Sequence, residues 1–189
     1  MLSLPRSWIH AAACITVAAL ALAGCSAEAT TAPTLAAITP TYHPSTPTPV
    51  SDADAEAAIA AYMAYIDMGN AVDAGTATRE DVLELTTGHQ KQFEVDLQDA
   101  LDSRGWKISG TSEVALATLN TRESPLDGTV YLDVCLDSRN VHAYDSGGNE
   151  VVLDRPPGML AITAELTSQN SGPWLLSNSE PREEGPSCE

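Results

Sequence analysis

Basic residues are scarce in this 189-residue sequence. Lysine and arginine together number 9, against 26 aspartates and glutamates, which gives a formal net charge of −17. Only Lys91 and Lys107 are lysines, and no run of basic residues occurs. A surface of this charge repels nucleic-acid phosphates and anionic lipid headgroups. The composition therefore excludes DNA or RNA binding, and we expect no nucleic-acid partner.

Residues that often carry catalysis are sparse as well. After residue 50 only two histidines occur, His89 and His142, and neither has the His/Cys spacing of a zinc site. The GxSxG stretch that marks a hydrolase nucleophile is also missing. We therefore predict no metal and no cofactor, and motifs assign no catalytic residue.

An apolar run long enough to be a membrane anchor is also missing. Arg6 is followed by IHAAACITVAALALAGC, and polar sequence begins directly after Cys25. A spanning helix needs about 20 apolar residues. A single early charge followed by a short apolar run is instead typical of an export signal. We predict that residues 1–24 are a signal peptide.

The end of this run carries a specific pattern. Leu22, Ala23, Gly24 and Cys25 resemble the lipobox of bacterial lipoproteins. The resemblance implies that Cys25 receives a diacylglycerol, becomes the first residue after cleavage and anchors the protein on the extracytoplasmic face of the cell membrane. The mature chain would then carry 8 basic and 26 acidic residues, a formal charge of −18. The alternative is a secreted protein cleaved nearby, in which Cys25 is incidental.

Residues 25–50 are rich in threonine, alanine and proline and show no hydrophobic periodicity. Such a segment buries too little apolar surface to offset its ordering entropy, so we interpret it as a linker. Its reach lies between about 30 Å as a coil and about 80 Å as polyproline. It would hold residues 51–189, one domain by size, near the membrane but off its surface.

Two or three amphipathic helices are predicted between residues 51 and 105, from three candidate segments. The first begins at a pair that resembles a capping box, Ser51 and Asp54, and the second begins at Thr78 and Asp81. The third ends at Gly105. Apolar residues recur at helical spacing in all three: Ile59, Tyr62, Met63 and Ile66 in the first, Val82, Leu83 and Leu85 in the second, and Phe93, Leu97 and Leu101 in the third.

After Gly105 the apolar period changes from near four residues to two. Strands are predicted over 106–120 and 129–137, in a hairpin within 141–154, and over 159–168 and 174–179. In the second of these, Val130, Leu132, Val134 and Leu136 share one face. Helices followed by an antiparallel meander indicate an α+β fold with the helices packed on the apolar face of the sheet.

The domain also resembles a known superfamily. Its helical opening with a pair of tyrosines, the Gly105-Trp106 boundary, the VCLDSRNVHAYDSGGNEV segment and the late Cys188 are similar to actinobacterial lipoproteins with a nuclear-transport-factor-2-like domain. The resemblance implies a cone in which a strongly curved antiparallel sheet wraps around the helices. Members of that superfamily include isomerases, dehydratases and non-catalytic binding modules, so the fold alone does not choose a function.

Two cysteines lie in the domain, Cys135 and Cys188. An even pair in an exported protein indicates a disulfide, which would tie a strand to the C-terminal tail. Closing a loop of roughly 50 residues corresponds to at most about 4 kcal/mol in the chain-entropy model. The alternative is a reactive thiol, which requires one of the two cysteines to lack a partner.

Asp133, Asp137 and His142 are the sharper candidates for chemistry. Cone-fold isomerases and dehydratases use Asp or a His-Asp pair inside an apolar pocket, where burial raises the carboxylate pKa. Here, however, both aspartates share the face of Cys135, which we expect to be solvated, so catalysis by them is disfavoured. The stretch 145–150, DSGGNE, is similar in composition to a cation-binding loop but lacks its ligand alternation, so we interpret it as a polar turn.

The sequence therefore supports two functional hypotheses. The leading one is a membrane-tethered, non-catalytic domain that binds an envelope component or a small ligand. The alternative is a lyase or isomerase acting on a small apolar molecule inside the cone. A sealed aliphatic interior would favour the binding module, and an open pocket that contains Asp or His would favour the enzyme.

Overall fold

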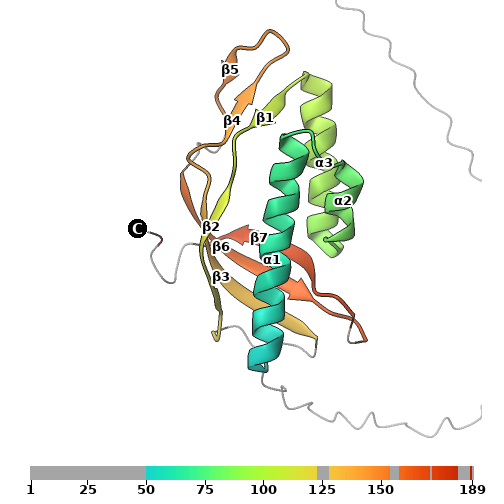
Figure 1. The fold of residues 1–189 in the computed structure, drawn as a ribbon, viewed down its shortest axis with the longest axis vertical. Helices are drawn as coiled ribbons and strands as arrows, with labels where there is room; N and C mark the ends of the chain where they lie inside the picture. The colour runs from blue at the N-terminus through green and yellow to red at the C-terminus, as the bar shows by residue number, and fades with distance from the viewer. Residues whose placement is uncertain (1–49, 123–127, 154–157, 171, 183–187, 189) are drawn as a thin grey trace, which may run out of the picture. The chain divides into compact units, whose positions relative to one another are not determined.

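The computed structural model describes residues 50–122, 128–153, 158–170, 172–182 and 188, all within one compact unit, 44–189. The predicted signal peptide, Cys25 and nearly all of the linker lie outside the described residues. The described part contains three helices followed by seven strands (Figure 1). The elements are α1 (Asp52–Asp73), α2 (Arg79–Glu84), α3 (Gly88–Arg104), β1 (Lys107–Ser109), β2 (Glu113–Leu119), β3 (Thr129–Asp137), β4 (His142–Tyr144), β5 (Glu150–Val151), β6 (Met159–Thr167) and β7 (Leu175–Pro181).

The helix ends follow the predicted local signals. The Ser51 hydroxyl accepts a hydrogen bond of 3.1 Å from the Asp54 backbone N–H at the start of α1. Thr78 and Asp81 form a capping box at the start of α2. Gly105 ends α3 with a left-handed φ of 64°, which glycine adopts without steric cost.

The strands form two antiparallel sheets. The larger has the order β2-β3-β6-β7 and the smaller the order β1-β4-β5. The single strand predicted over 106–120 is wrong, because the chain leaves one sheet and enters the other between β1 and β2. The Asn70 side chain fixes this corner, since its amide donates to the Ser112 carbonyl and its oxygen accepts from the Ser112 N–H, both at 2.8 Å.

The core lies between α1 and the larger sheet. All three helices lie on one side of that sheet (Figure 1), and Ala58 and Tyr62 of α1 are at most 1% exposed. The alternating residues of β3 pack against them as predicted: Val130, Leu132, Val134 and Leu136. The α+β class is therefore confirmed, and the arrangement is compatible with a nuclear-transport-factor-2-like curved sheet.

A backbone link attaches the helical layer to the far edge of the sheet. Thr86, just after α2, forms a parallel bridge with Leu176 of β7, and the Thr87 N–H donates to the Leu176 carbonyl at 2.9 Å.

Among the described helices, none has both the length and the apolar character required to cross a membrane.

Candidate functional site

Asp133 is buried, contrary to the expectation of a solvated face. Its exposed fraction is 6%, and Arg182, directly after β7, forms an ion pair of 2.9 Å with it. Arg122 contacts the same carboxylate at 3.4 Å. The sequence pattern missed this burial because Arg182, the buried one of the two arginines, follows Asp133 by almost fifty positions. Because Asp133 forms ion pairs with both arginines, we assign it a role in stabilising the fold.

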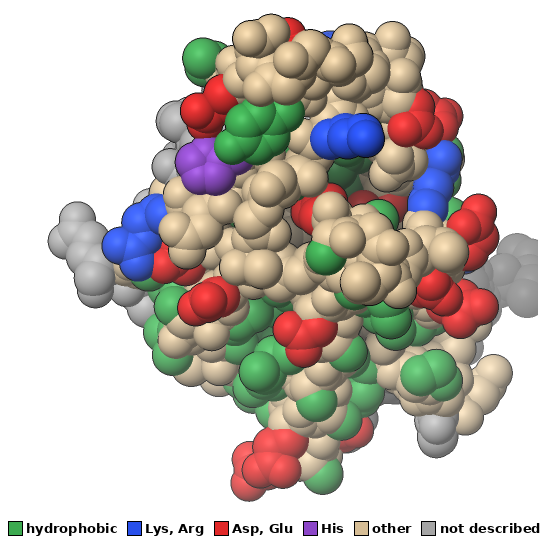
Figure 2. Space-filling model, turned by 45° about the horizontal axis from the view of Figure 1, so that its top comes forward, with side chains coloured by type: hydrophobic (Ala, Val, Ile, Leu, Met, Phe, Trp, Pro, Cys, Tyr) green, Lys and Arg blue, Asp and Glu red, His purple; other side chains and the backbone are tan. Residues whose placement is uncertain are grey.

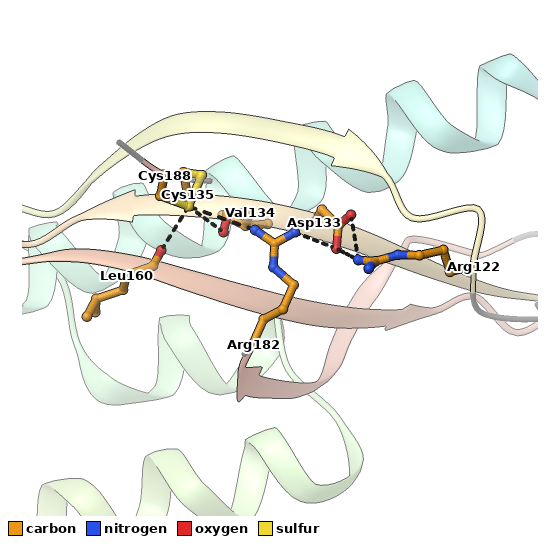
Figure 3. Close-up of a disulfide and its surroundings, with 7 residues drawn as sticks. All are labelled: Arg122, Asp133, Val134, Cys135, Leu160, Arg182 and Cys188. Carbon is orange, nitrogen blue, oxygen red and sulfur yellow. Dashed lines mark hydrogen bonds and ion pairs between the residues drawn. A yellow bond between two sulfur atoms is a disulfide. The ribbon is translucent and has the colours of Figure 1, made fainter. Parts of the chain in front are cut away.

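The predicted disulfide is present beside this ion pair (Figure 3). Cys135 and Cys188 have Cα atoms 5.4 Å apart, within the range that a disulfide requires. The Cys188 sulfur lies 3.9 Å from the carbonyl oxygens of Val134 and Leu160. Figure 3 shows Arg182 extending across the same face of the sheet toward Asp133. The bridge rules out a free reactive thiol at either cysteine.

The remaining predicted candidates are engaged on the surface. The Asp137 carboxylate pairs with Arg139, whose hydrogen bonds lower the Asp137 pKa to about 2. The His142 ring contacts Glu150 at 2.7 Å across the β4–β5 hairpin. Asp133, Asp137 and His142 therefore have separate partners, and none of the three lines the cavity described below.

The DSGGNE stretch forms the hairpin turn between β4 and β5. The Asp145 carboxylate accepts hydrogen bonds from the backbone N–H groups of Gly147 and Asn149, at 2.8 and 2.9 Å. Bonds from Asn149, followed by that from Gly147, lower the Asp145 pKa. The Asp145 carboxylate thus stabilises the turn backbone, in agreement with the interpretation of this stretch as a polar turn.

The apolar stripe predicted on α3 is not packed into the core. Phe93 and Leu97 are 50% and 41% exposed, and only Gln90 of this helix is buried. Together with Leu101 these side chains line a cavity between α1, α3 and the strands. The sequence pattern identified the apolar stripe correctly but not what it faces.

This cavity has a volume of about 470 Å³, and Figure 2 shows a hollow with carboxylate side chains in it and apolar side chains nearby. A site of this size suits a small molecule. The walls are largely aliphatic and aromatic, contributed by the helices and by both sheets: Ile66, Val72, Phe93, Leu97, Leu101, Trp106, Ile108, Leu136, Val141 and Leu160.

Tyr65 of α1 and Glu94 of α3 line the cavity and are hydrogen-bonded to each other and to Gln90. The Tyr65 hydroxyl of α1 donates to Glu94 of α3 at 2.5 Å, and the buried Gln90 amide donates to Glu94 at 2.8 Å and to the Tyr65 hydroxyl oxygen at 3.0 Å. Burial, reinforced by the Glu94 charge, raises the Tyr65 pKa well above 10. Tyr65 therefore stays protonated and fixes the position of the Glu94 carboxylate.

Asp73, the last residue of α1, lies at the exposed edge of the same cavity. Desolvation of its carboxyl group by the surrounding protein and, secondarily, the negative charge of Glu94 raise the Asp73 pKa from 3.8 to about 6. A carboxyl group with this pKa changes protonation state close to neutral pH. By the criterion set from the sequence, an open pocket that contains an aspartate counts for the enzyme. Asp73, however, is exposed at the edge of the cavity and is not enclosed by its apolar walls, so this aspartate does not decide between the two hypotheses.

Sequence reasoning missed Asp73, Glu94 and Tyr65. One signal was available, because Tyr65, Gly69 and Asp73 recur at intervals of four residues and so share a face of one helix. The sequence does not show that Glu94 lies against this face, because their contact depends on how α1 and α3 pack.

Comparison of the sequence with protein-family models and with curated proteins finds no match. The structure is similar to the intermembrane space region of the chloroplast protein ARC6, with 14% identity and a TM-score of 0.50, over 70% of this chain and 98% of that one. Two structures from Catenulispora acidiphila, one in complex with S-DNPA, share 11% identity, with TM-scores of 0.42 and 0.41. They cover 66% of this chain and 89% and 86% of theirs. The likeness to ARC6 concerns the fold alone.

Proposed function

We propose that this protein is a non-catalytic binding module that holds a small, largely apolar molecule in the cavity between α1, α3 and the strands. The observation that carries this proposal is the apolar wall of α3, where Phe93 and Leu97 remain 50% and 41% exposed at the cavity. Burying apolar area yields about 25 cal/mol per Å². A ligand that covers this wall would therefore bind favourably without refolding the domain.

We propose further that the module is tethered to the extracytoplasmic face of a membrane by a diacylglycerol on Cys25. The lipobox-like sequence and the proline-rich spacer support the tether. The Cys135–Cys188 disulfide supports export, because such bonds persist in oxidising compartments. The Cys25→Ser variant should be released into the medium and lose lipid labelling, whereas unchanged membrane retention would contradict the anchor.

Ligand binding can be tested without knowing the natural ligand. N-phenyl-1-naphthylamine is a neutral apolar dye whose fluorescence rises when it leaves water, and we expect the full chain to bind it. Gly69 lies on α1 at the cavity, and a Cβ added there meets no atom within 4 Å. The Gly69→Phe variant should therefore fill the cavity without a backbone clash and abolish dye binding.

The matched control is Gly69→Ala, which adds one methyl group at the same position and should retain dye binding. A Gly69→Phe protein that binds the dye as the wild type does would show that the dye occupies another surface. Absence of dye binding by the wild type would remove the support for an apolar ligand.

One observation favours the alternative of a lyase or isomerase. Asp73, with its pKa of about 6, could exchange a proton with a substrate near neutral pH. Incubating an envelope extract with the wild type and with Asp73→Asn, followed by mass spectrometry, separates the two hypotheses. A compound consumed only by the wild type would establish catalysis. For a binding module, we expect the same compounds in the same amounts after incubation with either protein.

A further inference from the structure

We infer that the cavity selects ligands with a cationic amine, which Asp73 and Glu94 hold at one end of an otherwise apolar site. This inference rests on the proposed ligand site and adds the chemical class of the ligand. The two carboxylates come from different helices and face one cavity. The negative charge of Glu94 adds to the rise in the Asp73 pKa that desolvation causes.

Neither carboxylate has a cationic partner among the residues that the structure describes. Glu94 accepts hydrogen bonds only from neutral groups of that part of the chain, the Tyr65 hydroxyl and the Gln90 amide. Asp73 forms no ion pair within the described ranges. An amine bound in this cavity would therefore find carboxylates available for charge-assisted contacts without displacing a protein cation.

The end of α1 adds negative potential at the same place. Asp73 is the last residue of a 22-residue helix whose last turn contains no basic residue. The helix dipole places partial negative charge at this end, where an anion is disfavoured and a cation is stabilised. The helix end and the two carboxylates thus favour the same sign of ligand charge.

Among the described residues that line this cavity, Arg104 is the cationic one, and it forms no ion pair with Asp73 or Glu94. Arg104 follows Glu94 by ten residues on α3, about 15 Å along the helix axis. Its guanidinium lies over the Trp106 ring, 4.8 Å from the centroid. The Arg104 guanidinium is therefore engaged by an aromatic ring and not by the two acids, and the apolar side chains of the lining suit the apolar body of an amphiphile.

Three probes with the same apolar cage test the inference: 1-adamantylamine, 1-adamantanol and 1-adamantanecarboxylate. Each is titrated against the dye bound to the full chain. We expect the amine to compete at least tenfold more strongly than the alcohol, the ratio equivalent to 1.4 kcal/mol, and the carboxylate to compete least. Asp73→Asn and Glu94→Gln should each remove most of the amine preference.

The control variant is Asp96→Asn, which removes the same charge from an exposed position of α3 outside the cavity and should keep the amine preference. Equal competition by all three probes would overturn the cationic class while leaving the proposed apolar site intact. Loss of the preference in Asp96→Asn as well would assign it to net charge and also overturn the inference. Failure of the dye itself to bind would instead remove the proposed function.

Discussion

At the scale of single residues, the most constrained group is the pair formed by Asp133 and Arg182. Their side chains are 8% and 5% exposed, and the two charges lie 2.9 Å apart. The backbone fixes Arg182 as well, since its N–H donates to the Ala161 carbonyl at 2.9 Å. Buried charges of this kind are costly to separate, because the remaining partner loses its compensation without regaining water.

Replacing Arg182 with methionine should therefore lower the free energy of unfolding by about 3 kcal/mol. Arg122 contacts the same carboxylate but is 52% exposed, so Arg122→Met should cost less than about 1 kcal/mol. Urea unfolding of the two variants gives the comparison. Equal losses would show that burial does not determine the strength of these contacts.

Asp73 should make stability depend on pH. Its pKa is raised to about 6 in the fold, so between about pH 4 and 6 the folded protein holds this proton more tightly than the unfolded chain. The contribution of Asp73 to stability therefore grows as the pH falls through this window, and its ionised form destabilises the fold at pH 7.

The Asp73→Asn variant should consequently be more stable than the wild type at pH 7, by a small amount because the side chain is exposed. The difference should vanish below pH 4, where Asp73 is protonated in both states. Melting temperatures measured from pH 4 to 8 test this, and a difference that is constant over the whole range would contradict it.

At the scale of elements, the corner between β1 and β2 decides how the two sheets join. Gly110 has a φ of 96°, and a Cβ built there would lie 1.7 Å from the Asn140 carbonyl oxygen. The chain of β1 therefore passes directly against the loop between β3 and β4. A side chain at this position would force the two segments apart.

We predict that Gly110→Ala destabilises the domain strongly. The matched control is Gly148→Ala, with a φ of 80° and no atom within 4 Å of the added Cβ, which should cost only the backbone strain of about 1–2 kcal/mol. Gly110→Ala should cost about 2 kcal/mol more, because of the steric overlap. Similar urea midpoints for the two variants would show that the corner tolerates the shift.

The elements themselves could be predicted because their signals are local. Ser51 and Thr78 begin helices and Gly105 ends one through contacts within a few residues, and the alternation of β3 gives its core face directly. The apolar stripe of α3 was predicted correctly from the spacing of its residues. That this stripe faces a cavity instead of the core could not be predicted, because no local signal in the sequence shows what an apolar face packs against. The same limit applies to Asp133, whose covering residue Arg182 follows it by almost fifty positions.

At the scale of the whole molecule, the disulfide joins β3, an inner strand of the larger sheet, to Cys188 near the end of the chain. Cys135 and Cys188 are separated by 53 positions, and the bridge lies on the face of the sheet opposite the helices, beside the buried ion pair. The core on the other face depends on apolar burial and contains neither cysteine.

Reduction should therefore lower the unfolding midpoint without unfolding the domain at moderate temperature. The expected loss is at most about 4 kcal/mol in the chain-entropy model. The Cys135→Ala/Cys188→Ala protein is the control, since reductant should not change its midpoint. A wild-type midpoint that is unaffected by complete reduction would show that the bridge adds no stability.

The central claim is that the cavity between α1, α3 and the strands holds a small molecule. The most direct measurement is native mass spectrometry of the protein isolated from its own cells, compared with the Gly69→Phe variant isolated in the same way. We predict a bound molecule with an apolar body and an amine on the wild type, and its loss from Gly69→Phe. The same bound molecules on both proteins, or none on the wild type, would contradict the account.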